Sequence, residues 1–168
     1  SLEGISGTGK TFYRQKLEEK FKDNPEIIFM KEIFDEAQEG LGKKIFSALY
    51  HTEDRFFNMG IPLTETMLLL SRSMYKYESA IKEALESGKI VIEDRSIDTI
   101  SIYQAVLIAQ KTGGNPLEIA NDIYTFAEKF RKLPETTFFF FFNSDLAIRR
   151  AELRDCNKYK QEEITLLK

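Results

Sequence analysis

The feature that most constrains the fold of this chain is a glycine-rich segment close to its first residue. The eight residues from Gly4 to Thr11, GISGTGKT, match the pattern G-x-x-x-x-G-K-[ST] in full. In this pattern the glycines let backbone N–H groups converge on a polyphosphate, and the N-terminus of the following helix adds positive potential. The predicted phosphate-binding residues are Gly4, Ser6, Gly7, Thr8, Gly9, Lys10 and Thr11.

The residues around the motif fit the structural context that it requires. Leu2-Glu3 can end a strand and residues 11–21 can form a helix, which places the motif between a strand and a helix. Lys10 is predicted to reach the β- and γ-phosphates of ATP, and the Thr11 hydroxyl is predicted to ligate Mg²⁺. The chain is therefore predicted to be a nucleotide-binding protein.

Length and composition limit the class of protein further. The 168 residues suit one α/β domain, and a hydrophobic content of 42% is enough to bury a core. The net charge of -3 argues against a protein held to nucleic acid by bulk charge. No apolar run approaches the roughly 20 residues of a membrane span. The single cysteine, Cys156, excludes an intramolecular disulfide framework and fits a reducing compartment, so we expect one cytoplasmic domain without nucleic-acid or membrane partners.

The rest of the chain alternates short apolar runs with longer helical patterns. Continuous hydrophobicity is typical of strands covered on both faces, and strands separated by helices need right-handed crossovers. We therefore predict an α/β fold of the P-loop NTPase type, with three α/β/α layers and a parallel sheet. The run Phe138–Phe142 is predicted to be a buried central strand. The predicted strands are 27–30, 90–92 and 137–142, and the clearest predicted helices are 62–87, 99–111 and 116–132.

The helix predicted over residues 62–87 carries apolar residues at steps of three and four. This spacing places them on one side of a helix and predicts that this side is buried. The residues of the predicted face are Leu63, Met67, Leu70, Met74, Tyr77, Ile81 and Leu85.

Polar residues follow the predicted strand 90–92 at the sheet edge where ligands bind in folds of this type. Asp94 can hold the water shell of a metal or an acceptor group, and Arg95 can grip a phosphate bidentately. Tyr103 and Gln104 follow on the next helix and offer an aromatic face and an amide. Taken alone, the first pair also fits a solvated ion pair, and the second pair also fits ordinary core and surface positions.

With these residues in place, the sequence resembles the thymidylate kinase family over nearly its whole length. That family has Asp-Arg-Tyr after its third strand and a Tyr-Gln pair on the next helix. Asp94, Arg95, Tyr103 and Gln104 stand at the matching spacing, with Ser96 in place of the family's Tyr. The resemblance implies that Arg95 binds the 5′-phosphate of the acceptor and that Asp94 assists the metal or the phosphates. It also implies that Tyr103 and Gln104 face the deoxynucleoside.

The resemblance extends to other substrate positions, and there the sequence departs from the family pattern. Lys31-Glu32 stand where the family has an Arg-Glu-Pro segment. Leu68 and Arg72 have the spacing of the aromatic residue and arginine that contact thymine in the family, slightly displaced from the expected alignment. Ser6 replaces an acidic residue of the family's phosphate loop. Lys31, Glu32, Leu68 and Arg72 are expected to bind substrate, while the departures leave the base of the acceptor open.

A basic segment near the end of the chain is similar to the mobile lid of the family. Asn143 to Asp145 are predicted to cap a helix, and the lid is expected at about residues 149–162. Arg149 and Arg154 are expected to supply the catalytic cations, because charge on the transferring phosphoryl group must be neutralised. The alternative is a solvated basic face of a helix.

The resemblance implies a Mg²⁺-dependent kinase that moves the γ-phosphoryl group of ATP onto a deoxynucleoside monophosphate, dTMP above all. It also implies a homodimer packed through helices. One alternative is a deoxynucleoside kinase, for which Glu32 is the candidate base. Another is a nucleotide-binding regulator or ATPase that lacks an acceptor site.

Both ends of the chain look short beside the five-stranded family. Leu2-Glu3 are only the end of a first strand, and Lys168 lies where the family has a helix after the lid. We therefore expect one kinase domain over residues 1–168 with a clipped first strand and no last strand, truncated at both ends.

Overall fold

The fold is known from a computed structural model that describes residues 1–30, 40–49, 60–154 and 164. Three of the predicted features fall outside these residues. They are the pair Lys31-Glu32, Cys156, and the part of the predicted lid that follows Arg154.

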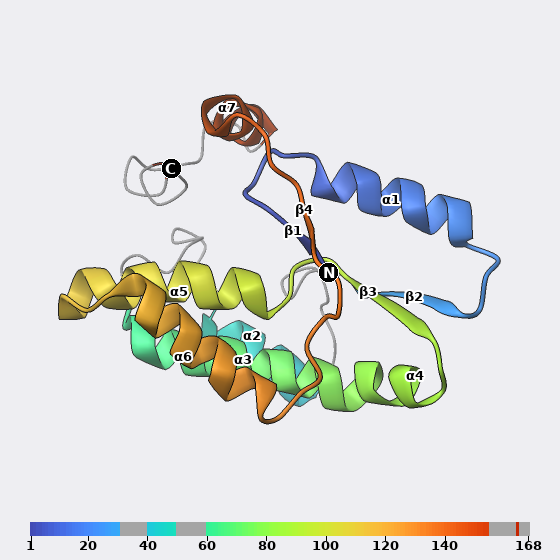
Figure 1. The fold of residues 1–168 in the computed structure, drawn as a ribbon, viewed down its shortest axis with the longest axis horizontal. Coiled ribbons are helices and arrows are strands. Elements are labelled where there is room, and N and C mark those ends of the chain that lie inside the picture. The colour runs from blue at the N-terminus through green and yellow to red at the C-terminus, as the bar shows by residue number, and fades with distance from the viewer. Residues whose placement is uncertain (31–39, 50–59, 155–163, 165–168) are drawn as a thin grey trace.

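A parallel sheet forms the middle layer of the molecule (Figure 1). Strand β2 pairs with β3 and strand β1 pairs with β4, in both cases parallel. A parallel bridge between Leu2 and Asp94 joins the two pairs, so the strands lie in the order β2-β3-β1-β4. This arrangement confirms the prediction of a parallel sheet. The strands are β1 (Leu2–Glu3), β2 (Ile27–Met30), β3 (Ile90–Glu93) and β4 (Phe138–Phe139).

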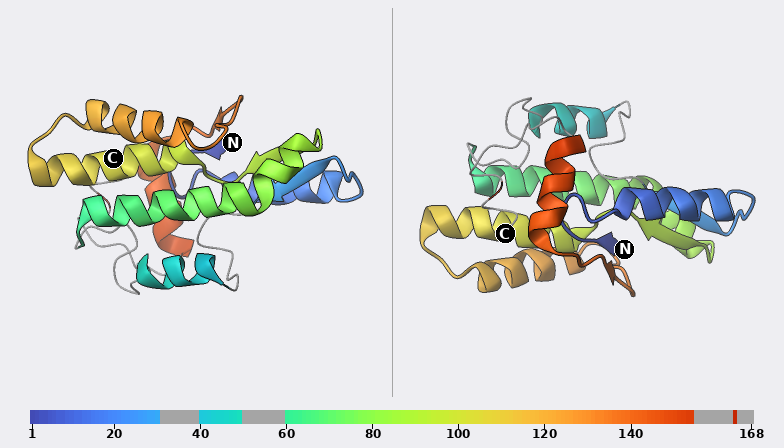
Figure 2. Two further views of the ribbon diagram at one scale, coloured as in Figure 1. Left: turned by 90° about the horizontal axis from the view of Figure 1, so that it is seen from below. Right: turned by 90° about the horizontal axis from the view of Figure 1, so that it is seen from above.

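Helices cover the two sides of this sheet, as Figures 1 and 2 show. On one side lie α1 (Lys10–Phe21) and α7 (Ser144–Arg154). The other side carries the larger helical layer, and the arrangement confirms the predicted three-layer α/β/α fold. The helices of this layer are α2 (Leu41–Leu49), α3 (Pro62–Lys76), α4 (Lys82–Glu86), α5 (Ile97–Thr112) and α6 (Pro116–Glu128).

The core of the described residues lies inside this helical layer. Leu49 of α2 packs with side chains from α3, α5 and α6, and Ile97 at the start of α5 is 1% exposed. Burial of these aliphatic side chains supplies the main favourable free energy of folding.

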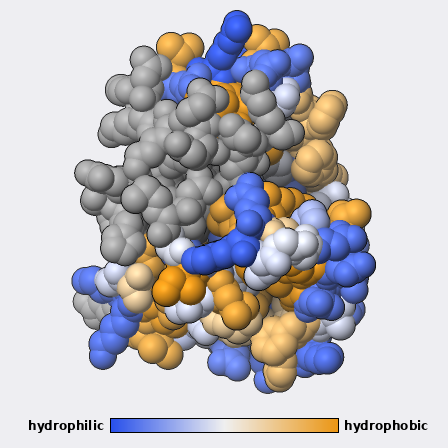
Figure 3. All heavy atoms as spheres, turned by 90° about the vertical axis from the view of Figure 1, so that its left-hand side faces the viewer, coloured by the Kyte–Doolittle hydropathy of each residue, from blue (hydrophilic) through white to orange (hydrophobic). Residues whose placement is uncertain are grey.

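At the end of the molecule shown in Figure 3, hydrophobic and hydrophilic side chains are interspersed on the surface. None of the described helices combines the length and apolar character that crossing a membrane requires.

The predicted helix over residues 62–87 is confirmed, but its predicted buried face is wrong at one end. Leu63 and Met67 are exposed, whereas Thr66, Leu69 and Ser73 are buried. The buried face includes two polar residues whose hydroxyls have partners inside the protein. Counting only apolar residues misses such positions. A five-residue π-helical turn, Tyr77–Ile81, links α3 to α4.

The phenylalanine run was predicted to be a buried central strand, and this prediction is wrong. Phe138, Phe139 and Phe141 are exposed by 62%, 63% and 85%. Strand β4 pairs only with β1 among the described residues and forms an edge of their sheet. Of this run, Phe140 packs on the ring of Tyr13 at 5.3 Å between centroids, while the rings of Phe139 and Phe141 contact each other.

Candidate active site

The glycine-rich loop turns between β1 and α1, and it passes close to both β4 and α7. A Cβ added at Gly7 would lie 1.8 Å from the carbonyl oxygen of Ala147, and one at Gly4 would lie 2.6 Å from that of Phe140. Gly9, with φ 94, adopts the left-handed conformation immediately before α1. Backbone crowding and positive φ values therefore require glycine in this loop.

Lys10 opens α1 and is buried under the loop. Its Nζ donates to the carbonyl oxygens of Gly4 at 2.6 Å and Ile5 at 2.9 Å. The first turn of α1 carries no acidic residue, so its N–H groups present positive potential toward the loop. Thr11 lies in that first turn and is exposed. The loop, the ammonium group and the end of the helix together form an anion site suited to phosphates.

Asp94 follows β3 directly and is 2% exposed. Its Oδ2 accepts a hydrogen bond from Nε of Arg14 at 2.9 Å, and Nη1 of Arg14 also donates to Glu18 at 2.6 Å. Arg14 belongs to α1, so this ion pair ties the end of β3 to the helix that carries Lys10. Arg14 was not among the predicted site residues, although its i,i+4 spacing to Glu18 was a visible signal of a helical ion pair.

The donors near the loop fit a magnesium ion that is held jointly with phosphates. Thr11 offers a hydroxyl and Asp94 a carboxylate, and Mg²⁺ prefers oxygen ligands, with one or two carboxylates besides substrate phosphates. In the described part of the chain no three His, Cys, Asp or Glu residues gather into a metal-binding group. This donor set is therefore compatible with Mg²⁺ and unsuited to a metal bound by protein side chains alone.

Arg95 lies at the turn between β3 and α5, next to the first residues of the chain. Its backbone N–H donates to the carbonyl oxygen of Leu2 at 3.2 Å, and Nη1 lies 3.3 Å from the Thr99 hydroxyl. Its φ of 61 is the only positive φ at a non-glycine residue in the described segments. Such a conformation is strained and persists only where the surroundings fix it.

Glu3 is the buried carboxylate closest in sequence to the loop. Oε1 accepts the N–H of Ser96 at 2.6 Å, and Oε2 accepts the hydroxyl of Thr99. Both donors belong to the N-terminal end of α5, so Glu3 caps this helix from a neighbouring strand. Burial raises the pKa of the Glu3 carboxyl, and these hydrogen bonds oppose that rise.

The predicted base-binding residues lie on two helices that pack together, α3 and α5. Gln104 is 2% exposed, and its Oε1 lies 2.9 Å from the hydroxyl of Thr66. Arg72 is 1% exposed, and its guanidinium lies 6.0 Å from the ring centroid of Tyr75. Leu68 is half-buried and packs against the core, and Tyr103 is half-buried on α5.

Gly42 of α2 encloses the guanidinium of Arg72 from a third helix. A Cβ added at Gly42 would lie 2.2 Å from Nη1 of Arg72. The structure thus places two of the four predicted base-binding side chains, Arg72 and Gln104, in buried positions between helices.

The first part of the predicted lid, residues 149–154, forms the C-terminal end of helix α7. The side chain of Asn143 accepts the N–H of Leu146 at 3.0 Å, as expected for a helix cap. Ala147 and Ala151 are buried, whereas Arg149 and Arg154 are exposed. The helix thus packs one face beside the phosphate loop and presents its arginines to solvent.

Comparison with known proteins points to one family. The family model described as thymidylate kinase matches residues 2–168. A probable thymidylate kinase of Methanosarcina barkeri is 32% identical over 157 residues, which cover 92% of this chain and 69% of the relative. A thymidylate kinase of Mycoplasma mobile is 33% identical over 157 residues, which cover 92% of this chain and 70% of the relative.

A solved structure supports the same fold. The crystal structure of thymidylate kinase from Ehrlichia chaffeensis superposes with a TM-score of 0.65 and 21% sequence identity. The match covers 94% of this chain and 84% of that chain. At this identity the likeness concerns the fold, in agreement with the parallel sheet and the two helical layers described above.

Proposed function

This chain belongs to the thymidylate kinase family, whose members transfer a phosphoryl group to dTMP, and we propose that its residues divide this reaction between two places. One is the phosphate loop with the start of α1, which binds the ATP that supplies the phosphoryl group. The other is the turn after β3, which binds the acceptor. The single observation that carries this division is that the bridge from Leu2 to Asp94 joins both places.

We assign the donor phosphates to the loop from Gly4 to Gly9 and to Lys10. The loop passes close to the backbone of Phe140 and Ala147, and its N–H groups are proposed to converge on the donor phosphates. The Nζ of Lys10 exchanges its carbonyl partners for phosphate oxygens, and its charge stabilises the negative charge of the transferring group.

Thr11 and Asp94 would hold Mg²⁺, directly or through water, and the ion would neutralise charge on the phosphates. Arg14 fixes the Asp94 carboxylate by a hydrogen bond of 2.9 Å. A carboxylate held in this way needs no reorganisation when the nucleotide binds.

Arg95 is proposed to bind the 5′-phosphate of dTMP. A phosphate oxygen of dTMP attacks the γ-phosphorus of ATP, the bond to the β-phosphate oxygen breaks, and ADP leaves. The attacking oxygen is already an anion, so no general base is needed and positioning dominates. Arg149 and Arg154 are the proposed further cations, and both lie exposed on α7.

Tyr103 and Gln104 of α5, with Leu68 and Arg72 of α3, are proposed to face the deoxynucleoside. Lys31 and Glu32 are the further residues proposed to bind the acceptor. The contact between the Thr66 hydroxyl and Gln104 supports this assignment, because it holds the amide in one orientation. A fixed amide discriminates between donor and acceptor patterns on a base.

We further propose a cytoplasmic homodimer packed through helices. Exposed apolar side chains on α3 and α5, Leu63, Met67 and Ile102, support an interface in the helical layer. Sedimentation at several concentrations tests this proposal, and a protein that remains monomeric throughout would overturn it.

The reaction is tested by ADP release from ATP with a panel of acceptors: dTMP, dUMP, dCMP, dGMP and thymidine. We expect release that depends on dTMP and is absent with thymidine. A Lys10→Ala protein with an unchanged circular dichroism spectrum serves as the control and should lose activity. Release that requires thymidine, or that is independent of any acceptor, would contradict the proposal.

A further inference from the structure

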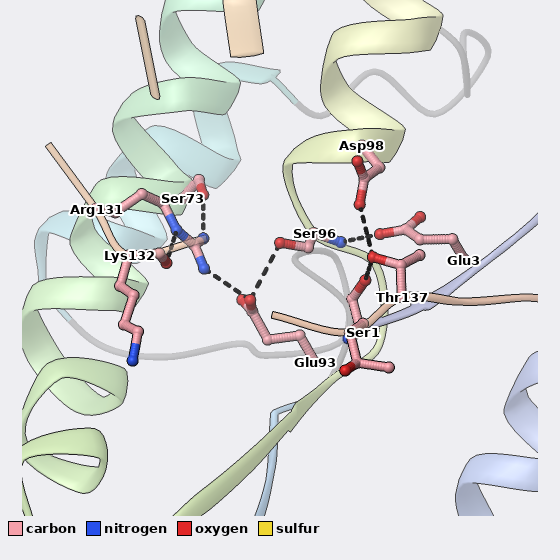
Figure 4. Close-up of polar contacts among 10 residues, drawn as sticks. Ser1, Glu3, Ser73, Glu93, Ser96, Asp98, Arg131, Lys132 and Thr137 are labelled. Carbon is pink, nitrogen blue, oxygen red and sulfur yellow. Dashed lines mark hydrogen bonds and ion pairs between the residues drawn. The ribbon is translucent and has the colours of Figure 1, made fainter. Parts of the chain in front are cut away.

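One buried arginine, which lies outside the proposed site, contacts the end of β3, the strand that leads into the proposed acceptor-binding turn. Arg131 follows α6 and is 4% exposed. Its Nη2 donates to Oε2 of Glu93 at 2.7 Å, and its Nη1 donates to the hydroxyl of Ser73 at 2.8 Å, as Figure 4 shows. Its guanidinium also lies 5.5 Å from the ring centroid of Tyr77 in the π-helical turn.

This ion pair is isolated from solvent on both sides. The side chains of Arg131 and Glu93 are 2% and 7% exposed. Desolvating two charges costs free energy that their mutual attraction only partly returns, so a buried pair is weak evidence of a purely stabilising role. Its fixed geometry, with hydrogen bonds to Ser73 and a contact with Tyr77, is better suited to holding Glu93 in one position.

Glu93, held in this position, in turn holds the residues that follow it in the sequence. Its Oε2 also accepts the hydroxyl of Ser96 at 3.1 Å, and the N–H of Ser96 donates to Glu3 at 2.6 Å. Glu93 and Ser96 flank Asp94 and Arg95 in the sequence. Both ends of the turn are therefore held by buried carboxylates, one from β3 itself and one from β1 (Figure 4).

The turn that these hydrogen bonds hold contains the residue with a strained backbone, Arg95. Arg95 has a φ of 61, a conformation that costs free energy for a side chain of this size. It needs surroundings that fix the backbone on both sides. The hydrogen bonds of Glu93 and Ser96 provide this, and Arg131 anchors them to the helical layer.

We infer that Arg131 is a positioning residue for acceptor binding, which acts through Glu93 and Ser96 to hold Arg95 in the conformation that receives the acceptor phosphate. This inference rests on the proposed role of Arg95. Arg131 itself touches neither nucleotide. Its loss lets the turn relax, so that the Arg95 guanidinium no longer points at the phosphate, whereas the phosphate loop on the other side of the sheet keeps its geometry.

The test compares three variants in steady-state kinetics: Arg131→Met, Arg131→Lys and Lys132→Met. For Arg131→Met we expect the KM for dTMP to rise about ten- to a hundredfold, because misplacement of a binding group by about 1 Å has effects of this size. The KM for ATP should stay within about twofold, since the donor site is intact. Arg131→Lys keeps the charge but cannot reach Glu93 and Ser73 together, and it should give an intermediate KM for dTMP.

Lys132→Met is the matched control, because it changes the neighbouring, exposed lysine and should leave both KM values unchanged. If Arg131→Met does not fold, the double variant Glu93→Gln/Arg131→Met removes both charges, and it should show the same selective rise for dTMP. A folded variant in which both KM values rise together, or neither rises, overturns the inference. Absence of dTMP-dependent activity in the unaltered protein would instead overturn the proposed function.

Discussion

Two neighbouring carboxylates at the end of β3, Glu93 in the strand and Asp94 directly after it, form buried ion pairs with arginines from opposite sides of the sheet. Asp94 pairs with Arg14 of α1 at 2.9 Å, and Glu93 pairs with Arg131 after α6 at 2.7 Å. Successive side chains of a strand point to opposite faces, so adjacent residues of the same chemical type reach different layers.

The two ion pairs differ in what they hold. Arg14 lies on the helix that begins with Lys10, and it fixes the carboxylate beside the phosphate loop. Arg131 lies on the side of the helical layer, and it fixes the backbone around Arg95. Similar chemistry is thus expected to serve the donor half of the reaction in one case and the acceptor half in the other.

The largest expected difference is between Asp94→Asn and Glu93→Gln, two substitutions that each remove one charge. Asp94→Asn should lower kcat roughly a hundredfold, a typical loss for a group that acts on the transferring phosphoryl. Glu93→Gln should change kcat little and raise the KM for dTMP. Initial rates at saturating and limiting dTMP separate the two effects. Equal losses of kcat in both proteins would show that the two carboxylates do not have separate roles in the reaction.

The next effect concerns stability. Replacing Arg131 by Met leaves Glu93 as a buried charge without its partner, and removing one partner of a buried pair costs about 3 to 5 kcal/mol. Adding Glu93→Gln should restore much of this loss, because the uncompensated charge disappears. Arg14→Met should cost a similar amount, since it leaves the buried carboxylate of Asp94 without its partner. Urea denaturation measures all three, and a double variant less stable than Arg131→Met would contradict the explanation.

A smaller, pH-dependent effect is expected at Glu3, a buried carboxylate that accepts hydrogen bonds from uncharged donors. Burial raises its pKa above the usual 4.5, so just above pH 4.5 the folded protein keeps a proton that the unfolded chain has released. The contribution of Glu3 to the free energy of unfolding therefore falls as the pH rises through this range.

Glu3→Gln removes this titration and keeps one oxygen for the N–H of Ser96. The stability of the variant relative to the unaltered protein should therefore increase as the pH rises above 4.5. Denaturation curves over a series of pH values measure the difference. A difference that is constant across the series would mean that Glu3 does not titrate in this way.

The smallest effect is expected for the exposed pair Lys132–Glu135, which sits beside Arg131 in the sequence. Hydrogen bonding to Glu135 raises the pKa of Lys132, and the same contact lowers the pKa of Glu135. Because solvent screens exposed charges, Lys132→Met should leave the urea midpoint unchanged. A clear shift of that midpoint would mean that this surface pair supports the buried one.

The donor half of the site was predictable because its signal is local. Eight consecutive residues specify the loop, and the flanking strand and helix are adjacent in the sequence. The place of Asp94 and Arg95 directly after a strand was also predictable, since the strand is recognisable in the sequence and ligands bind at such strand ends. The parallel sheet and the helical layers followed from the alternation of apolar runs with helical patterns.

The hydrogen bonds that hold the turn after β3, where the acceptor is proposed to bind, were not predictable in the same way. Glu3, Ser73, Ser96 and Arg131 come from four separate parts of the chain, and they meet only in the folded structure. In the sequence Arg131 stands beside Lys132 and has no feature that distinguishes a buried arginine from an exposed one. The burial of Thr66 and Ser73 has the same origin, because their partners lie 38 and 58 residues away.

For the phenylalanine run the error has the opposite direction, because residues that were predicted to be buried are exposed. Five consecutive aromatic residues indicate a buried strand by composition alone, yet β4 lies at an edge of the described sheet and Phe141 is 85% exposed. Hydrophobicity predicts which residues are able to be buried, whereas burial itself depends on what packs against each face.

The division between the two ion pairs is tested most directly by calorimetric titration of Arg14→Met and Arg131→Met with each ligand separately. We predict that Arg131→Met weakens binding of dTMP about tenfold and leaves binding of a non-hydrolysable ATP analogue with Mg²⁺ nearly unchanged. Arg14→Met should weaken the ATP analogue by a similar factor, since it loses the group that orients Asp94, and it should leave dTMP binding nearly unchanged. Equal losses for both ligands in both variants would contradict the account.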